Sequence, residues 1–482
     1  MHSRRGRGGT LRAALLIDFG STYTKVSAVD LDEPRLLARA QAPTTYATDL
    51  ALGLRAALEN LRKACGGSLP AFAYRLACSS AGGGLRMVAV GLVPELTAEA
   101  ARRAALGAGA RVLATYSGTL DEQAVADLAA RSPDVVLLAG GTDGGNRRAL
   151  VDFARALAGT PLRAAVVVAG NRDAAPEAAA ILRRAGKDVR VVENVLPRLD
   201  TLNVEPARAA IREVFLERIA IARGWERVQA EVDGILMPTP AAVLRGAELL
   251  AGGAGDEPGL GELVVVDIGG ATTDVHSVAA GLPADGRTVL RGLPPPRSQR
   301  TVEGDLGLRH GAPSLLEAAG LPAEDPQSAD RWRRCARLRA EEPGYVPEGE
   351  EERQVDAWLA REAVRLAMER HVGRREALMT PRGRQWIQRG KDLRAVPHLI
   401  GTGGIFLHTS DPGWLLAAAT DPEGQGPLLK PQAPAAWIDG GYLMAHMGLL
   451  AEVKPVAALR LLKQSLQRVD LPRSATGAPA RP

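Results

Sequence analysis

The sequence predicts an α/β protein built from two related lobes. Apolar runs of strand length alternate with helical patterns along most of the 482 residues, as in mixed α/β folds. There is also an internal repeat: Leu15–Asp30 and Val264–Ala279 each combine an apolar strand, an Asp-x-Gly turn, small hydroxyl residues and a return strand.

No apolar run approaches the ~20 residues needed to cross a bilayer. We therefore expect a soluble cytoplasmic protein.

The predicted elements follow from hydrophobic periodicity and from glycine and proline stops. The predicted strands are Ala13–Ile17, Lys25–Asp30, Tyr74–Ser79, Val135–Ala139, Ala164–Ala169, Leu263–Asp267, Thr272–Val278 and Pro397–Ile400. The predicted helices are Asp49–Cys65, Thr97–Leu106, Leu120–Arg131, Arg147–Leu157, Pro206–Arg223, Thr239–Ala251, Gly441–Leu450 and Pro455–Gln467. Residues 321–395 form a charged, mainly helical block.

Composition excludes several classes of function. The net charge is +5, which by itself would favour nucleic-acid binding. The basic residues are mostly arginine and scattered along the chain, and aromatic residues make up only 4%, so no stacking platform for single strands is visible. We expect a solvated basic surface, with neither a nucleic-acid nor a membrane partner.

Cysteine and histidine spacing gives no sign of a structural metal. Cys65, Cys78 and Cys335 are not spaced like a metal or redox pair. Three thiols in a chain of this length indicate a reducing compartment. The seven histidines include no HExxH motif.

The first motif with chemical content is the turn after the first strand, Asp18-Phe19-Gly20-Ser21-Thr22-Tyr23-Thr24-Lys25. Phosphate oxygens are acceptors only, so they need donors at close range. Gly20 lets the backbone approach, Ser21 and Thr22 offer hydroxyls, and Lys25 adds positive charge. Asp18 can hold a hydrated Mg²⁺. The alternative is an ordinary hairpin turn with a surface lysine.

The second motif repeats this logic in Asp267-Ile268-Gly269-Gly270-Ala271-Thr272-Thr273-Asp274. Asp267 can hold the metal or the attacking water, and the glycines admit a phosphate. Thr272 and Thr273 are further donors. A hairpin with an aspartate at its mouth is the alternative, but the recurrence of the pattern between two strands weakens it.

The third motif, Ile400-Gly401-Thr402-Gly403-Gly404-Ile405-Phe406, follows a strand. Its glycines would allow the backbone to contact an adenine and a ribose. The alternative is a loop without a binding role. GxGxxG after a strand is absent, so this is not a dinucleotide fingerprint.

In this order the three motifs resemble the phosphate and adenosine motifs of the actin, Hsp70 and sugar-kinase ATPase superfamily. Met237–Val243 and Asp439–Ala445 are similar to its two connecting helices, although Asp439 replaces the usual small residue. Longer stretches resemble the MutL family of accessory proteins of adenosylcobalamin-dependent glutamate mutase. They are Ile17–Lys25, Leu137–Asn146, Val192–Arg198, Arg300–Arg309, Leu399–Phe406 and the tail.

The resemblance implies a two-lobed actin-like fold made of duplicated ribonuclease-H-like domains, with ATP and Mg²⁺ between the lobes. We expect a first lobe over 1–250, a second over 251–430 with a helical insertion at 321–395, C-terminal helices over 431–470 and a disordered tail over 471–482. It further implies ATP hydrolysis, mutase subunits as partners and a role as a reactivating chaperone.

The site residues expected on this basis fall into two groups. The catalytic group is Asp18, Asp267 and Thr272, of which Asp18 and Asp267 also bind the metal. The nucleotide-binding group is Gly20, Ser21, Thr22, Tyr23, Lys25, Gly269, Gly270, Ala271, Thr273, Gly401, Thr402, Gly403 and Gly404.

Three rival functions stay open at this stage. A small-molecule kinase of the same fold needs a catalytic aspartate facing an acceptor, and none is evident. An actin-like filament protein would assemble with ATP. The iron–sulfur activators of this superfamily need a cysteine pair near the second phosphate motif, where this chain has none.

Three further features have no assigned role. Gly140–Gly145 lacks the GK[ST] ending of a P-loop, so we interpret it as a strand–helix turn capped by Asn146, with a partner or cofactor contact as the alternative. Glu303 and Asp305 are interpreted as solvated turn carboxylates rather than Mg²⁺ ligands. His276, on a predicted strand, is expected to be structural.

Overall fold

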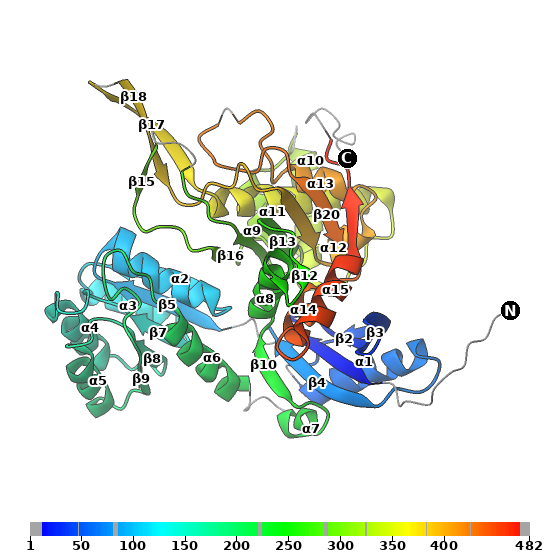
Figure 1. Cartoon of the computed structure of the whole chain (residues 1–482), viewed down its shortest axis with the longest axis horizontal. Helices are drawn as coiled ribbons and strands as arrows, with labels where there is room; N and C mark the ends of the chain where they lie inside the picture. The colour runs from blue at the N-terminus through cyan, green and yellow to red at the C-terminus, as the bar shows by residue number, and fades with distance from the viewer. Residues whose placement is uncertain are drawn as a thin grey trace. The chain divides into compact units, whose positions relative to one another are not determined.

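The computed structural model describes residues 12–46, 48–80, 85–219, 224–283, 288–322, 325–381, 383–424 and 426–472 (Figure 1). By its internal contacts the chain divides into two compact units. The first comprises Met1–Gly82, Ile219–Gly259 and Leu443–Ser465, and the second comprises Gly83–Arg218, Leu260–Tyr442 and Leu466–Pro482.

The first unit is built on a five-stranded sheet in the order β10-β4-β1-β2-β3. β1 pairs antiparallel with β2, and β2 antiparallel with β3, whereas β1, β4 and β10 run parallel. Every residue of β1 is buried. The strands are β1 (Ala13–Phe19), β2 (Tyr23–Asp30), β3 (Arg35–Pro43), β4 (Phe72–Ser79) and β10 (Gly234–Pro238).

Helices complete this unit. α1 packs against β2 and β3, and α8 packs against α14. The second contact is close: a side chain at Gly246 of α8 would lie 2.5 Å from the Met444 carbonyl oxygen of α14. The elements are α1 (Leu50–Ala64), α7 (Trp225–Gln229), α8 (Thr239–Gly252), α14 (Met444–Leu450), α15 (Pro455–Ser465), and the short strands β11 (Gly253–Ala254) and β12 (Glu257–Pro258).

The second unit contains a six-stranded sheet, β16-β14-β13-β19-β20-β21, that repeats the first topology. β16, β14 and β13 are antiparallel neighbours, and β13, β19 and β20 run parallel. β21 adds one antiparallel strand. The strands are β13 (Leu263–Ile268), β14 (Thr273–Val278), β16 (Ser298–Glu303), β19 (His398–Thr402), β20 (Ala435–Asp439) and β21 (Leu466–Val469).

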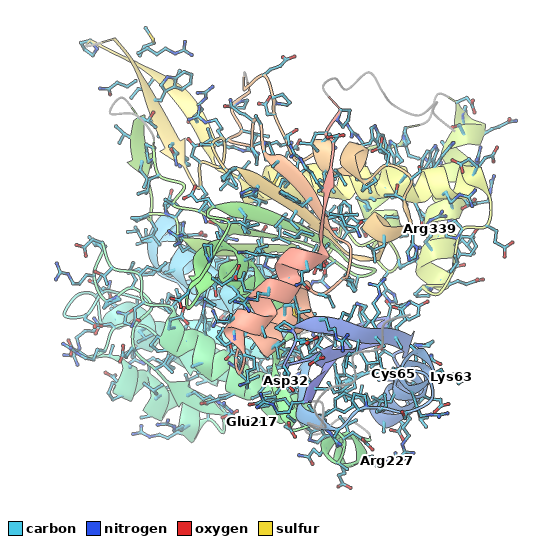
Figure 2. The ribbon with its side chains drawn as sticks, turned by 45° about the vertical axis from the view of Figure 1, so that its right-hand side comes forward. Asp32, Lys63, Cys65, Glu217, Arg227 and Arg339 are labelled. Atoms are coloured by element: carbon cyan, nitrogen blue, oxygen red, sulfur yellow. The ribbon has the colours of Figure 1, made fainter. Side chains whose placement is uncertain are left out.

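The same order and directions in both sheets confirm the predicted duplication of a ribonuclease-H-like domain. α11 packs on β13, β14 and β16, and its apolar side belongs to the core of this unit. Arg339 of α10, labelled in Figure 2, is fully buried there and pairs with Asp356 of α11. The helices are α9 (Ala312–Ala319), α10 (Pro326–Glu341), α11 (Glu350–His371), α12 (Gly404–His408) and α13 (Pro412–Ala417).

The second unit also contains a doubly wound, fully parallel sheet in the order β6-β5-β7-β8-β9 with its own apolar core. Its strands are β5 (Arg86–Gly91), β6 (Arg111–Ser117), β7 (Val135–Leu138), β8 (Ala165–Val168) and β9 (Val189–Val191). Its helices are the π-helix Pro94–Ala98, α2 (Glu99–Gly107), α3 (Glu122–Ala130), α4 (Arg148–Ala158), α5 (Ala175–Arg184) and α6 (Glu205–Ile219).

A small sheet of three strands, β15-β18-β17, completes the second unit. β15 (Thr288–Arg291) pairs parallel with β18 (Gly383–Arg389), and β17 (Arg374–Thr380) pairs antiparallel with β18. Figure 1 shows the β17–β18 hairpin extending from the larger sheet of its own unit.

Two predicted helical regions need correction. Within 321–395, α10 and α11 are helices, but 374–380 and 383–389 are the strands β17 and β18, because Thr380 pairs with Gly383, whose φ of +101° is not helical. Within 431–470, α14 and α15 are flanked by the strands β20 and β21. The predicted tail lies outside the described residues from 473 onward.

The predicted lobe boundaries at 250 and 430 stay a prediction. The contact-based units divide the chain differently, because residues 83–218 form a separate parallel sheet that groups with the second unit.

Candidate functional site

The turn between β1 and β2 is tight enough to require glycine. The Gly20 amide donates to the Tyr23 carbonyl at 3.1 Å, and a Cβ at Gly20 would lie 2.6 Å from that oxygen. Ser21 is exposed at the tip of the turn. The tightness of the turn therefore explains the glycine at position 20, and its predicted contact with a phosphate stays a prediction.

Asp18, the last but one residue of β1, is held by donors from two other elements. It is 3% exposed. The Thr239 hydroxyl, at the start of α8, donates to Asp18 Oδ1 at 2.6 Å, and Lys25 Nζ lies 3.3 Å from Oδ2. Cys78 Sγ lies 3.6 Å from Oδ1. These contacts fix the carboxylate at the carboxyl end of β1.

Burial and the neighbouring carboxylate keep Cys78 a neutral thiol. Its pKa is raised well above the ordinary value, first by burial and then by the charge of Asp18. Neither Cys78 nor Thr239 was predicted to lie in the site. The parallel pairing of β4 and β10 beside β1 brings both residues to the same sheet edge as Asp18.

One hydroxyl in this loop is buried without a partner. Thr22 Oγ1 is covered and has no hydrogen-bond partner among the described residues. An unsatisfied buried polar atom is costly. A ligand oxygen or a water at Thr22 would satisfy it, which fits the predicted role of this loop in holding a polyphosphate.

The second loop, between β13 and β14, repeats the tight turn. The Gly269 amide donates to the Thr272 carbonyl at 2.8 Å. The amides of Leu308 and Arg309 donate to the carbonyls of Gly269 and Gly270 at 3.1 and 2.8 Å. The loop conformation is thus fixed from two sides, and Asp267 lies half-buried at its start.

The two threonines of this loop are already engaged in internal contacts. Thr272 Oγ1 donates to Asp274 Oδ2 at 2.9 Å, and Thr273 Oγ1 donates to the Leu306 carbonyl at 2.7 Å. Asp274 in turn pairs with the buried Arg300. In this arrangement both hydroxyl protons are used within the protein, and the predicted role of Thr272 and Thr273 as phosphate donors stays a prediction.

The third loop lies beside the second. β19 runs parallel to β13 with Thr402 opposite Asp267. Gly403 has φ +118°, and a Cβ there would lie 2.3 Å from the Ile268 carbonyl oxygen. Thr402 is buried, and its hydroxyl donates to Asp439 Oδ2 at 3.2 Å. The ends of three adjacent parallel strands therefore bring Asp267, Thr402 and Asp439 to one edge.

Asp439, which departs from the superfamily pattern, was not among the predicted site residues. It is 1% exposed. Its place at the end of β20, parallel to β19, was not predicted because this strand was included in a helical region.

Two of the three features without an assigned role have hydrogen-bond or ion-pair partners, whereas neither ring nitrogen of His276 has a hydrogen-bond partner among the described residues. Asn194 and Asn171 donate to carbonyls of the Gly140–Gly145 loop, and Asn146 caps α4 through the Ala149 amide, as predicted. Arg370 binds both Glu303 and Asp305. His276 is fully buried, and its pKa is lowered well below the ordinary value, first by burial and then by the charge of Arg300.

No cluster of three or more His, Cys, Asp or Glu side chains suited to a metal occurs among the residues that the structure describes. Mg²⁺ bound with a nucleotide needs only one or two carboxylates, because phosphate oxygens and waters complete its shell. Asp18 in the first unit and Asp267 in the second each offer one such carboxylate, and their predicted roles as Mg²⁺ ligands stay predictions. Over the same described ranges, no helix is long and apolar enough to cross a membrane.

Two sheets of one topology, each with an aspartate and a tight glycine turn at the end of its first strand, define the actin, Hsp70 and sugar-kinase class of fold. The sequence profile of the MutL protein family matches residues 14–466. Protein MutL of Clostridium tetanomorphum is 48% identical over 460 residues, which cover 95% of this chain and 100% of that protein. The chain therefore belongs to the MutL family.

Two solved structures resemble this chain over nearly its whole length, with low TM-scores. Gluconate kinase from Lactobacillus acidophilus has a TM-score of 0.35 and 9% identity, covering 96% of this chain and 94% of that one. The Aquifex aeolicus Ppx/GppA phosphatase has a TM-score of 0.23 and 11% identity, covering 96% of each chain. The fold class rests on the strand order and not on these superpositions.

Proposed function

We propose that this protein binds ATP with Mg²⁺ through its three glycine loops and hydrolyses it. We further propose that it uses this cycle to reactivate a cobalamin-dependent mutase such as glutamate mutase. The observation that carries the proposal is the duplication: Asp18 and Asp267 occupy equivalent places, each at the end of the first strand of its sheet and directly before a tight glycine turn. Membership of the MutL family supports the mutase as partner.

The chain's own residues would divide the work between binding and positioning. Magnesium ATP, when bound, supplies the phosphoryl group and the cation that neutralises its charge. Asp18, held in one orientation by Thr239 and Lys25, would bind the hydrated cation. Asp267 would orient the attacking water. Phosphoryl transfer is catalysed mainly by such positioning and electrostatics.

The adenosine end would be bound by the third loop. Gly404 is exposed, and a Cβ there would meet no atom within 4 Å, so the backbone of the loop is open at this position. Gly403 packs against the Ile268 carbonyl, which ties this loop to the phosphate loop of the same sheet. Binding at the third loop would therefore affect the conformation of the phosphate loop between β13 and β14.

Reactivation requires that nucleotide state changes the affinity for the mutase. A ligand shifts a conformational equilibrium only by its differential affinity for the two states. The ATP and ADP forms should therefore bind the mutase subunits with different affinity. This difference would drive exchange of damaged cobalamin for the intact cofactor.

The direct test of the nucleotide step is calorimetry with ATP, with and without Mg²⁺. We expect binding that depends on Mg²⁺. Asp267→Asn should leave binding largely intact and slow hydrolysis by ~10²-fold. Asp330→Asn, which changes an exposed carboxylate on α10, is the control and should hydrolyse ATP like the parent. Absence of heat at millimolar ATP, or equal hydrolysis by Asp267→Asn and the parent, would reject the proposal.

A further inference from the structure

The small three-stranded sheet of the second unit carries a row of three arginines. Arg389 of β18 lies directly opposite Arg374 of β17 and, on its other side, opposite Arg291 of β15. Residues directly opposite in a sheet project from the same face. All three are exposed. Pairing of the three strands thus places arginines that are distant in the sequence in one basic row.

No ion pair within the described residues neutralises this row of arginines. Like charges directly opposite each other destabilise a sheet. None of the three arginines has an ion pair or a side-chain hydrogen bond among the described residues, whereas many other arginines of this chain are paired. The one carboxylate on the same face is Glu376 of β17, which pairs in register with Ile387. The face therefore keeps a net positive charge.

Apolar side chains adjoin the row on the same face. By alternation along each strand, Val289, Ile387 and Leu378 project with the arginines. Val289 is 57% exposed and Leu378 is 46% exposed. We call Arg291, Arg374, Arg389, Val289, Ile387 and Leu378 the arginine face.

The opposite side of the sheet is held by contacts within the unit. The guanidinium groups of Arg375 and Arg384 lie 4.9 and 4.3 Å from the ring centre of Trp386. Gln388 is buried and donates to the Gly281 carbonyl at 2.9 Å, and Arg375 donates to the Gly424 carbonyl at 2.9 Å. The sheet is thus anchored on one side, which leaves the arginine face open and pre-organised.

We propose that the arginine face is a docking surface for an acidic, partly apolar patch on a protein partner. Arginine beside exposed aliphatic side chains is the composition of protein interfaces, whereas a phosphate backbone or a lipid headgroup offers nothing to Val289 and Leu378. Charge complementarity requires carboxylates on the partner. Taking the mutase as that partner rests on the function proposed above.

The test compares charge reversal on the two sides of one strand. Arg389→Glu inverts the centre of the row. Arg384→Glu makes the same change in net charge on the opposite side of β18 and is the matched control. Kd for purified mutase subunits is measured for each variant at low and high salt. ATP binding, which reports on the fold, is measured in parallel. If Arg389→Glu fails to fold, Arg291→Glu on the edge strand β15 replaces it.

We expect Arg389→Glu to weaken mutase binding by ~10- to 100-fold, with a smaller salt dependence than the parent and unchanged ATP binding. Arg384→Glu should stay within ~3-fold of the parent. If the parent binds the mutase and Arg389→Glu binds it equally well, the docking surface is refuted while the proposed function stands. If the parent binds no mutase with ATP or ADP, both fail. Loss on Arg389→Glu of binding to duplex DNA or to phosphatidylserine vesicles, with mutase binding unchanged, would also overturn it.

Discussion

Gly403 offers the sharpest test of the way the third loop is built. Its backbone has φ +118° and ψ +153°, a region that is open essentially only to glycine and costs other residues ~1–3 kcal/mol. In addition, a Cβ there would lie 2.3 Å from the Ile268 carbonyl oxygen, and that backbone oxygen cannot swing away. Gly403→Ala must therefore move the loop away from β13. We expect the free energy of unfolding to fall by at least the ~1–3 kcal/mol of backbone strain.

The neighbouring glycine supplies the control. A Cβ at Gly404 meets no atom within 4 Å, and Gly404 begins α12, where alanine is favoured over glycine. Gly404→Ala should keep the stability of the parent, yet weaken ATP binding, because the added methyl group enters the space assigned to adenosine. Gly403→Ala should lose both stability and ATP affinity.

The assays are urea unfolding and ATP calorimetry on the three proteins. A Gly403→Ala variant that unfolds at the parental urea concentration would refute the reasoning about the loop. Parental ATP affinity in both variants would remove the third motif from the nucleotide site.

Three further outcomes are expected. Thr239→Val removes the 2.6 Å hydrogen bond to Asp18. It should lower the free energy of unfolding by ~1–3 kcal/mol and weaken Mg²⁺–ATP binding in calorimetry, whereas Thr239→Ser should keep the parental stability and ATP affinity. Arg339→Met leaves the buried Asp356 without its closest cation and should lower the free energy of unfolding in urea by ~3 kcal/mol. Burial lowers the pKa of His446 to about 4, below the ordinary ~6.5. The unfolded chain thus takes up the proton first, and stability should fall as pH drops from ~6.5 to ~4 by up to ~1.4 kcal/mol per pH unit. In urea unfolding measured across this pH range, the stability of His446→Gln should depend less steeply on pH than that of the parent. An equal dependence on pH would contradict the lowered pKa of His446.

Local patterns predicted much of this fold. The turns after β1 and β13 were recognisable because a buried run ends at an aspartate and a glycine, and because the pattern occurs twice. The sheet order in each unit then follows from the superfamily resemblance. The same glycine signal located Gly403, whose positive φ no other residue would adopt without strain.

Other features depend on contacts between distant segments. Thr239 reaches Asp18 only because β10 and β4 line up beside β1. The β17–β18 hairpin was predicted as part of a helical block, because its many arginines interrupt the alternation of apolar and polar residues that indicates a strand. The arginine row exists only through the pairing of β15 with β18, which no spacing in the sequence reveals.

The measurement that tests the central claim most directly is cobalamin exchange in an inactivated mutase. The mutase is first inactivated with hydroxocobalamin, and this protein is then added with free adenosylcobalamin, with or without ATP and Mg²⁺. We predict that exchange and restored turnover need ATP and are slowed by Asp267→Asn in proportion to its loss of hydrolysis. Exchange that is equally fast without ATP, or with Asp267→Asn, would contradict the claim that ATP hydrolysis drives reactivation.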